Sequence, residues 1–221
     1  MTRLAVFDCD GTLVDSGATI YRALAETFDA HKLALPPARE CRRVIGLSLT
    51  EAMAALVPDA AERDHLELAE TYKGCFFRAR QRGEVEEPLF DGILELLDSL
   101  EADGWLLAVA TGKSDRGLRH CLDSHGINAR FVSLQTADRH PSKPSPHMVL
   151  AAMADAGVTG AATIVVGDTS FDMAMGLAAG ATPIGAAWGY HDADELAAAG
   201  AVAVAEIPAE VSRLARESMH G

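Results

Sequence analysis

The sequence has no long apolar run. The N-terminal run from Leu4 to Phe7 is far shorter than the apolar core of a signal peptide, and no stretch approaches the length of a membrane span. These absences argue against secretion and against membrane insertion. We therefore expect a cytoplasmic protein with no membrane partner.

Positive charge and paired cysteines are also scarce. The chain has 19 Lys and Arg against 32 Asp and Glu, a formal net charge of -13, whereas proteins that bind the nucleic acid backbone depend on positive potential. We therefore expect no nucleic acid partner. The four cysteines are dispersed without any Cys-x-x-Cys spacing, so the sequence predicts neither a zinc site nor a disulfide framework. They are Cys9, Cys41, Cys75 and Cys121.

Short apolar runs indicate the fold class. The chain of 221 residues is long enough for one large domain, or for a core with a smaller insert. Continuously apolar runs at Leu4–Phe7, Trp105–Ala110 and Thr163–Val166 are typical of parallel strands that helices cover on both faces. The sequence therefore predicts an α/β protein with a doubly wound parallel-sheet core.

A helical segment interrupts this pattern after the first strand. Helices are predicted from Ser16 to about His31, over Leu49–Val57 and from about Ala60 to Gln81, and a polar linker follows at Gly83–Pro88. We assign residues 1–15 and 88–221 to the α/β core. Residues 16–87 form an inserted all-helical cap over the ends of the strands.

Polar residues follow each of the three predicted strands, and the ligand crevice of an open α/β sheet lies at the carboxyl ends of its strands. The three clusters are therefore expected to face one site. Asp8 and Asp10 lie only two positions apart, where like charges repel, so a purely structural role does not account for the pair. The clusters are Asp8-Cys9-Asp10, Thr111-Gly112-Lys113 and Gly167-Asp168-Thr169.

The chain contains four motifs in the order Asp8-x-Asp10-Gly11-Thr12, Thr111-Gly112, Ser142-Lys143-Pro144 and Gly167-Asp168-Thr169-Ser170-Phe171-Asp172. In sequence and order, these motifs resemble those of the haloacid dehalogenase superfamily of phosphohydrolases. The resemblance spans nearly the whole chain, with the helical insert in the position of that family's cap, and in detail it is to phosphoglycolate-phosphatase-like members. It implies a Rossmann-like core and a Mg2+-dependent phosphatase that hydrolyses a small soluble phosphomonoester through an aspartyl-phosphate.

The catalytic roles follow from the residue types together with this resemblance. Asp8 is the expected nucleophile, and Asp10 protonates the leaving oxygen and later deprotonates water. Thr111 and Lys143 are expected to bind the phosphoryl oxygens, together with the backbone amide of Gly112.

Oxygen ligands at the same strand ends favour Mg2+ as the cofactor. Asp8 and Asp168 are the expected carboxylate ligands, and the family adds the carbonyl of Asp10. Asp172, four residues after Asp168, is expected on the same helix face and behind the metal ligands.

Substrate selection is assigned to the cap. The segment 44–49 is the best candidate for contact with the substrate, and Gly46 and Ser48 are its predicted binding residues because a glycine permits close backbone approach. Gly46 equally fits a role that only ends a helix. Other positions that can select the substrate are Arg42, Tyr72 and Lys73.

Several alternatives stay open. A phosphomutase of the same superfamily uses the same four motifs, and a catalytically silent regulatory relative is the non-enzyme alternative. A receiver domain is disfavoured because its acceptor aspartate ends the third strand, and a dehalogenase because it does not need Asp10. The expected partner is a small phosphorylated metabolite, and the expected oligomeric state is a monomer or homodimer.

Overall fold

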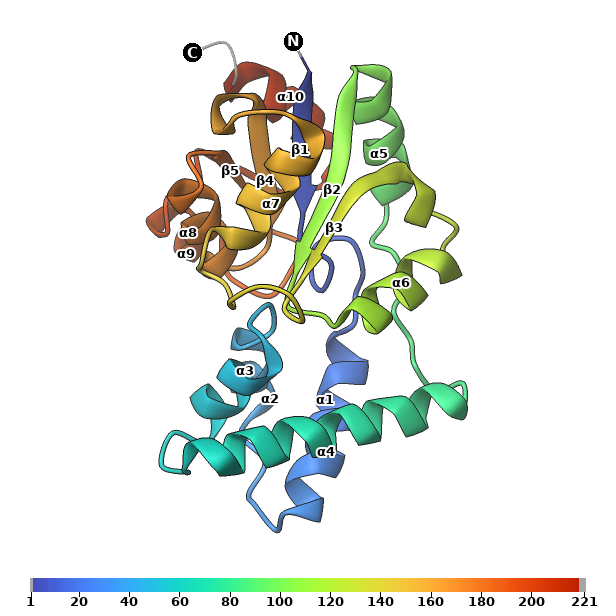
Figure 1. The fold of residues 1–221 in the computed structure, drawn as a ribbon, viewed down its shortest axis with the longest axis vertical. Helices are drawn as coiled ribbons and strands as arrows, with labels where there is room; N and C mark the ends of the chain where they lie inside the picture. The colour runs from blue at the N-terminus through green and yellow to red at the C-terminus, as the bar shows by residue number, and fades with distance from the viewer. Residues whose placement is uncertain (1, 219–221) are drawn as a thin grey trace.

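The strands form one parallel sheet. The computed structural model describes residues 2–218, and its six strands follow the order β3-β2-β1-β4-β5-β6 (Figure 1). The α/β class predicted from the sequence is confirmed. The strands are β1 (Arg3–Phe7), β2 (Trp105–Thr111), β3 (Phe131–Thr136), β4 (Thr163–Gly167), β5 (Thr182–Ala186) and β6 (Ala203–Ala205).

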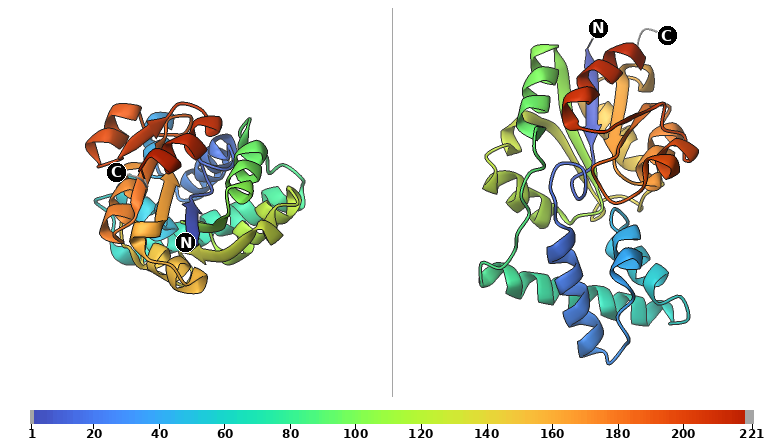
Figure 2. Two further views of the ribbon diagram at one scale, coloured as in Figure 1. Left: turned by 90° about the horizontal axis from the view of Figure 1, so that it is seen from above. Right: turned by 180° about the vertical axis from the view of Figure 1, so that it is seen from behind.

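Helices cover both faces of the sheet because successive residues of a strand point to opposite faces. In the central strand β1, Ala5 and Phe7 join a cluster with α5, α6 and α10, while Leu4 and Val6 join a second cluster with α7 and α8 (Figure 2). The core therefore has three layers. Its helices are α5 (Ile93–Ala102), α6 (Asp115–Ser124), α7 (His147–Ala156), α8 (Ser170–Ala178), α9 (Ala193–Ala198) and α10 (Pro208–Ser218), with short 3-10 helices at Asn128–Arg130 and Gly160–Ala162.

The helical insert consists of α1 (Gly17–Ala30), α2 (Ala38–Arg43), α3 (Leu49–Leu56) and α4 (Glu62–Gln81). Here α4 packs across α1 and α3, and the shared apolar cluster includes Leu24, Phe28, Met53 and Leu68. The insert faces the carboxyl ends of the strands (Figure 1). Helix α2 was not predicted from the sequence, because Cys41 is its single fully buried residue and the other side chains give no apolar period.

Two linkers join the insert to the core, and they lie side by side. The backbone nitrogen of Asp15 donates to the carbonyl of Pro88 at 2.8 Å. A few residues further on, the Thr19 hydroxyl donates to the carbonyl of Glu86, also at 2.8 Å. The chain therefore enters and leaves the insert at the same place. Among residues 2–218, no helix has the length and apolar character needed to cross a membrane.

Candidate active site

Asp8 lies at the carboxyl end of β1, where burial on both faces of the sheet holds the backbone in place. Its carboxylate is buried, and Oδ1 accepts a hydrogen bond from the Cys9 backbone at 2.6 Å. The ammonium group of Lys143 lies 2.8 Å from Oδ2 of Asp8. Lys143 comes from the loop after β3, and its side chain is fully buried at 0% exposure. It is therefore part of the site and is not a surface lysine.

Asp168 follows β4 and is held by groups from two other segments. The Thr12 hydroxyl donates to Oδ1 at 2.7 Å, and the Tyr190 backbone nitrogen donates to Oδ2 at 2.9 Å. Gly11 and Gly189 leave the room for this packing, because a Cβ at either position would lie 2.2 Å from an Asp168 atom. The absence of a side chain at Gly11 therefore provides the space that the Asp168 carboxylate occupies.

Asp172 joins the site from the first turn of α8. Its Oδ2 accepts hydrogen bonds from the backbone nitrogen and the hydroxyl of Thr169, at 3.1 and 2.7 Å, and these bonds cap the helix. Its Oδ1 lies 2.6 Å from the Lys143 ammonium. Helix α8 begins at Ser170, so Asp168 precedes it and the predicted shared helix face is wrong. The two carboxylates converge from a strand end and a helix start instead.

Negative charge exceeds positive charge in this cluster. One oxygen each of Asp8, Asp168 and Asp172 lie within 4.8 Å of one another. Burial raises the pKa of Asp8 to about 7, and Lys143 opposes the rise. Burial, followed by the charges of Asp172 and Asp8, raises the pKa of Asp168 well above its ordinary value. Burial alone would lower the pKa of Lys143, but Asp172 and Asp8 outweigh it and raise that pKa.

This donor set fits a hard divalent cation. Three buried carboxylates with a single ammonium leave uncompensated negative charge, and hard oxygen ligands are those that Mg2+ prefers. Asp172, which the sequence analysis placed behind the metal ligands, lies in the same group of carboxylates as Asp8 and Asp168.

Asp10 is buried beside these carboxylates, but its own partners differ. The Ser16 hydroxyl donates to its Oδ1, and the Lys113 ammonium lies 2.8 Å from the same oxygen. Lys113 also lies 2.7 Å from Oε1 of Glu87, a buried residue of the second linker. Burial alone would lower the pKa of Lys113, but Asp10 and Glu87 raise it well above its ordinary value. The sequence analysis placed Lys113 in a polar cluster expected to face the site but gave it no individual role, and it gave none to Ser16 or Glu87.

Thr111 and Gly112 end β2 on the same side of the sheet. The Thr111 hydroxyl is buried and accepts a hydrogen bond from the backbone nitrogen of Lys113 at 3.3 Å. Gly112 touches the helical insert, because a Cβ there would lie 2.3 Å from the Leu47 carbonyl oxygen. The backbone of Ser48 donates to the Ser142 hydroxyl at 2.7 Å. The segment 44–48 therefore contacts two loops of the core.

A second contact joins insert and core beside α8. The backbone nitrogen of Ser170 donates to Nδ1 of His191 at 3.2 Å, while Nε2 faces the Arg43 carbonyl at 3.3 Å. The Arg43 guanidinium also pairs with Glu195 at 2.8 Å. His191 has no metal-ligand spacing in the sequence, and in the structure it connects the two parts of the protein.

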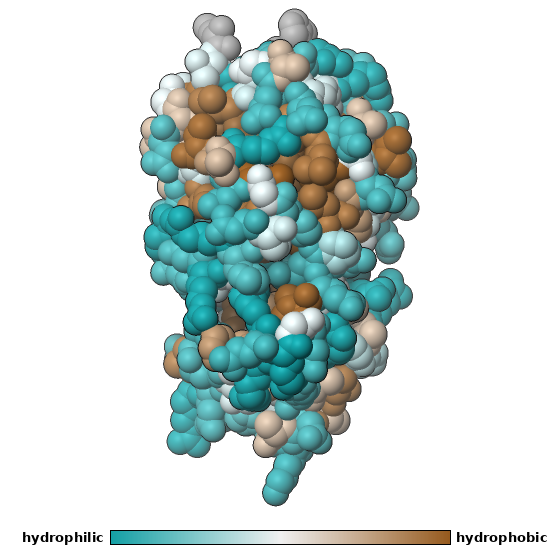
Figure 3. Space-filling view, turned by 90° about the vertical axis from the view of Figure 1, so that its right-hand side faces the viewer, coloured by the Kyte–Doolittle hydropathy of each residue, from teal (hydrophilic) through white to brown (hydrophobic). Residues whose placement is uncertain are grey.

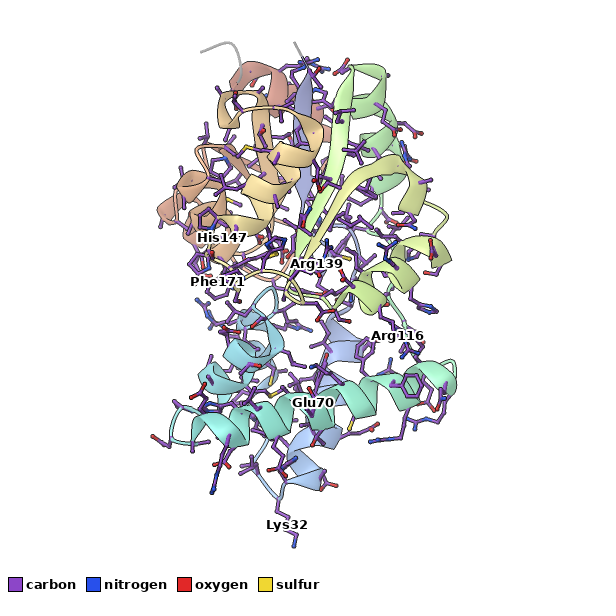
Figure 4. All side chains as sticks on the ribbon, viewed as in Figure 1. Lys32, Glu70, Arg116, Arg139, His147 and Phe171 are labelled. Carbon is purple, nitrogen blue, oxygen red and sulfur yellow. The ribbon has the colours of Figure 1, made fainter. Side chains whose placement is uncertain are left out.

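A cavity of about 450 Å³ opens next to Asp10, between the insert and the core. Figure 3 shows the surface hollowed between these two parts. Its wall combines apolar side chains such as Leu24 and Phe76 with the cations Arg80 and Arg116. Arg116 extends from α6 toward α4 and lies 4.8 Å from the ring of Phe77 (Figure 4). Of the predicted cap positions, Gly46, Ser48, Tyr72 and Lys73 line the cavity and Arg42 does not.

Arg80 has buried donors that the protein leaves without hydrogen bonds. Among residues 2–218, its Nε and Nη2 atoms have no hydrogen-bond partner, and Nη2 lies 3.6 Å from Oε2 of Glu87. A buried donor without an acceptor is costly. Arg80 also lines the cavity, so its guanidinium is the candidate partner for an acceptor group bound there.

The sequence profile of the haloacid dehalogenase-like hydrolase family matches residues 5–186. The chain belongs to this family. Across 90% of its length it is 34% identical to the probable phosphatase IndB of Dickeya dadantii, of which the match covers 87%. It is also 30% identical to a phosphoglycolate phosphatase of Agrobacterium fabrum, over 87% of this chain and 83% of the relative. The prediction of a hydrolase of this superfamily, made from the four motifs, is confirmed.

Solved structures agree with the fold. A hydrolase from Pseudomonas syringae superposes with a TM-score of 0.84 at 25% identity, over 97% of this chain and 98% of that one. A predicted phosphatase from Clostridium acetobutylicum gives a TM-score of 0.87 at 23% identity, with the same two coverages. The second likeness concerns the fold alone.

Proposed function

We propose that this hydrolase is a Mg2+-dependent phosphatase that acts on a small phosphomonoester through an aspartyl-phosphate. The observation that carries the proposal is the environment of Asp8: a buried carboxylate at a strand end, with the Lys143 ammonium 2.8 Å away. A carboxylate of this kind is the nucleophile that phosphoryl transfer requires, and a fixed cation beside it stabilises the phosphoryl oxygens. The phosphatase relatives support the same interpretation.

Two steps follow from the residues of this chain. In the first, an Asp8 oxygen attacks phosphorus, the bond to the leaving oxygen breaks, and Asp10 gives that oxygen a proton. In the second, Asp10 takes a proton from water, the water oxygen attacks phosphorus, and the bond to Asp8 breaks to release inorganic phosphate. Lys143 holds the phosphoryl oxygens through both steps, and Asp172 keeps Lys143 in position.

Asp8, Asp168 and Asp172 are the residues that would hold Mg2+. When bound, the ion neutralises charge on the carboxylates and on the phosphoryl group. The carbonyl of Asp10 stays the further ligand that the family resemblance implies.

The substrate is a phosphoglycolate-like ester or a sugar phosphate, selected by the helical insert acting as a cap. The volume of the cavity, about 450 Å³, is in the range of small-molecule sites. The Arg80 guanidinium in its wall, with two donors that lack a hydrogen bond, favours a leaving group that carries an acidic group, since guanidinium groups bind carboxylates well.

The decisive experiment measures release of inorganic phosphate from a panel of phosphorylated metabolites in the presence of Mg2+. Ranking the panel by kcat/KM identifies the substrate class, and an isomerised sugar phosphate without phosphate release would establish a phosphomutase instead. The Asp8→Asn variant keeps the shape of the side chain and removes its charge, so turnover should fall at least about a thousandfold. Asp59→Asn, at an exposed position, is the matched control. Near-wild-type turnover by a verified Asp8→Asn preparation would refute the nucleophile assignment.

A further inference from the structure

The contacts of Asp10 are all on one side of its carboxylate. The Ser16 hydroxyl donates to Oδ1, and the Lys113 ammonium lies 2.8 Å from the same atom. Within residues 2–218, the side-chain contacts of this carboxylate involve Oδ1 and leave Oδ2 unengaged. The two oxygens therefore have distinct environments.

Lys113 is itself held by a second carboxylate. Glu87 Oε1 lies 2.7 Å from the Lys113 ammonium, and Oε2 faces Arg80 of α4 at 3.6 Å. The side chains of Lys113, Asp10 and Glu87 are 9%, 10% and 6% exposed, so water screens these charges weakly. Charges alternate along this chain of contacts, from the acid-base aspartate through Lys113 and Glu87 to the helical insert.

Two carboxylates share Lys113, because its ammonium lies 2.8 Å from Oδ1 of Asp10 and 2.7 Å from Oε1 of Glu87. Glu87 therefore helps to fix the position from which Lys113 contacts Asp10. The geometry thus separates the anchored oxygen of Asp10 from the oxygen that exchanges protons.

We propose that Lys113, supported by Glu87, is a positioning residue for Asp10: it fixes Oδ1 and thereby presents Oδ2 to the leaving oxygen. This inference rests on the proposed phosphatase function and goes beyond it, because it names residues outside the four motifs. Lys113 does not touch the reacting phosphorus in this role. Its effect is confined to proton transfer.

Proton transfer has a specific kinetic signature. An alkoxide leaving group needs a proton, whereas 4-nitrophenolate is stable enough to leave without one, so a misplaced acid slows only the alkyl ester. The parameter kcat/KM reports the steps up to formation of the aspartyl-phosphate and therefore excludes its hydrolysis. Each variant is compared on 4-nitrophenyl phosphate and on the best alkyl phosphomonoester of the metabolite panel.

The variants are Lys113→Met and Glu87→Gln, with Asp10→Asn as the positive reference. We expect each to lose at least about tenfold in kcat/KM on the alkyl ester and less than about threefold on 4-nitrophenyl phosphate, because general acid catalysis contributes roughly 100- to 10,000-fold. Lys32→Met is the matched control: it removes a lysine from the exposed far end of the insert (Figure 4), and both esters should react at the wild-type rate.

A double variant tests whether Glu87 acts through Lys113. Lys113→Met combined with Glu87→Gln should lose no more on the alkyl ester than Lys113→Met alone. Equal losses on the two esters, in either single variant, would overturn the positioning role and leave a structural one. If Lys113→Met fails to fold, the nearly isosteric Glu87→Gln decides the question by the same ratio. No phosphate release by the wild type from any ester would instead refute the proposed function itself.

Discussion

Gly46 of the helical insert lies directly beside Asp8 of the sheet. A Cβ built on Gly46 would be 3.7 Å from Oδ2 of Asp8 and 3.4 Å from the Thr169 side chain. The residue has a φ of +100° and is buried. The glycine that separates α2 from α3 therefore also brings the backbone of the insert to the candidate nucleophile.

Gly46→Val should impair both activity and stability. Gly46 is buried, and its positive φ strains any side chain. We expect a loss of about 1–3 kcal/mol in the free energy of unfolding. We also expect a larger fall in kcat/KM for the preferred metabolite than for a small generic phosphate ester.

The matched control for this variant is Gly126→Val in the core. Gly126 has a φ of +68°, and a Cβ at this position would have no atom within 4 Å, so the change adds backbone strain alone. Its unfolding free energy should fall while kcat/KM stays at the wild-type value. Equal kcat/KM losses for Gly46→Val on both substrates would move specificity elsewhere in the insert, with Tyr72 and Lys73 next to test.

Chelation should abolish activity, and added Mg2+ should restore it. The reason is the uncompensated charge of Asp8, Asp168 and Asp172. Excess Ca2+ should inhibit, since its longer and looser coordination misplaces the nucleophile. A binding readout is the melting temperature, which Mg2+ should raise in the wild type and raise less in Asp168→Asn. Full activity after exhaustive chelation would contradict the metal requirement.

Asp8 should make the stability of the metal-free protein depend on pH. Burial raises its pKa from 3.8 to about 7, so the native state holds this proton at a pH where the unfolded chain has lost it. The contribution of Asp8 to the free energy of unfolding therefore falls as pH rises from about 4 to about 7. Asp8→Asn escapes this loss.

Chemical denaturation in chelator at pH 5 and pH 7.5 measures this effect. The stability of Asp8→Asn relative to wild type should increase by at least about 1 kcal/mol between the two pH values, since one pKa unit corresponds to about 1.4 kcal/mol. Saturating Mg2+ should remove most of the increase. A pH-independent difference would show that Asp8 is ionised in the native state throughout.

Arg80→Gln should alter substrate preference. If its donors without a hydrogen bond bind an acidic leaving group, kcat/KM should fall at least about tenfold more for 2-phosphoglycolate than for an uncharged alkyl phosphate. Arg82→Gln, an exposed change near the end of the same helix whose guanidinium pairs with Glu84, should leave both values unchanged. Equal losses on the two esters would assign Arg80 to its contact with Glu87 alone.

The sequence predicted the strands that the sheet buries most completely. β1, β2 and β4 lie next to one another in the middle of the sheet, and burial on both faces makes each of them continuously apolar. The edge strand β3 exposes Val132, β5 contains a proline and a glycine, and β6 has three residues. These strands give no continuous apolar run, so only the assembled sheet reveals them.

The candidate site also combines residues that the sequence predicted with contacts that it did not predict. Asp8, Asp10, Asp168 and Lys143 belong to motifs whose order along the chain is informative, and the structure brings all four to one edge of the sheet. The contact between Lys113 and Glu87 joins the end of a strand to a linker 26 positions away in the sequence. No short sequence motif indicates a contact between residues so far apart.

Because the two linkers lie next to each other, the helical insert can be replaced by another segment during evolution. Asp15 and Pro88 are joined by a hydrogen bond of 2.8 Å. With respect to the core, the insert is therefore one long loop whose two ends lie next to each other. The entropy of closing such a loop grows only logarithmically with its length. Segments of very different size can therefore be exchanged at this junction without altering the order of the strands. With the proposed division of labour, substrate selectivity can change by exchange of the insert alone, while the residues at the ends of the strands stay the same.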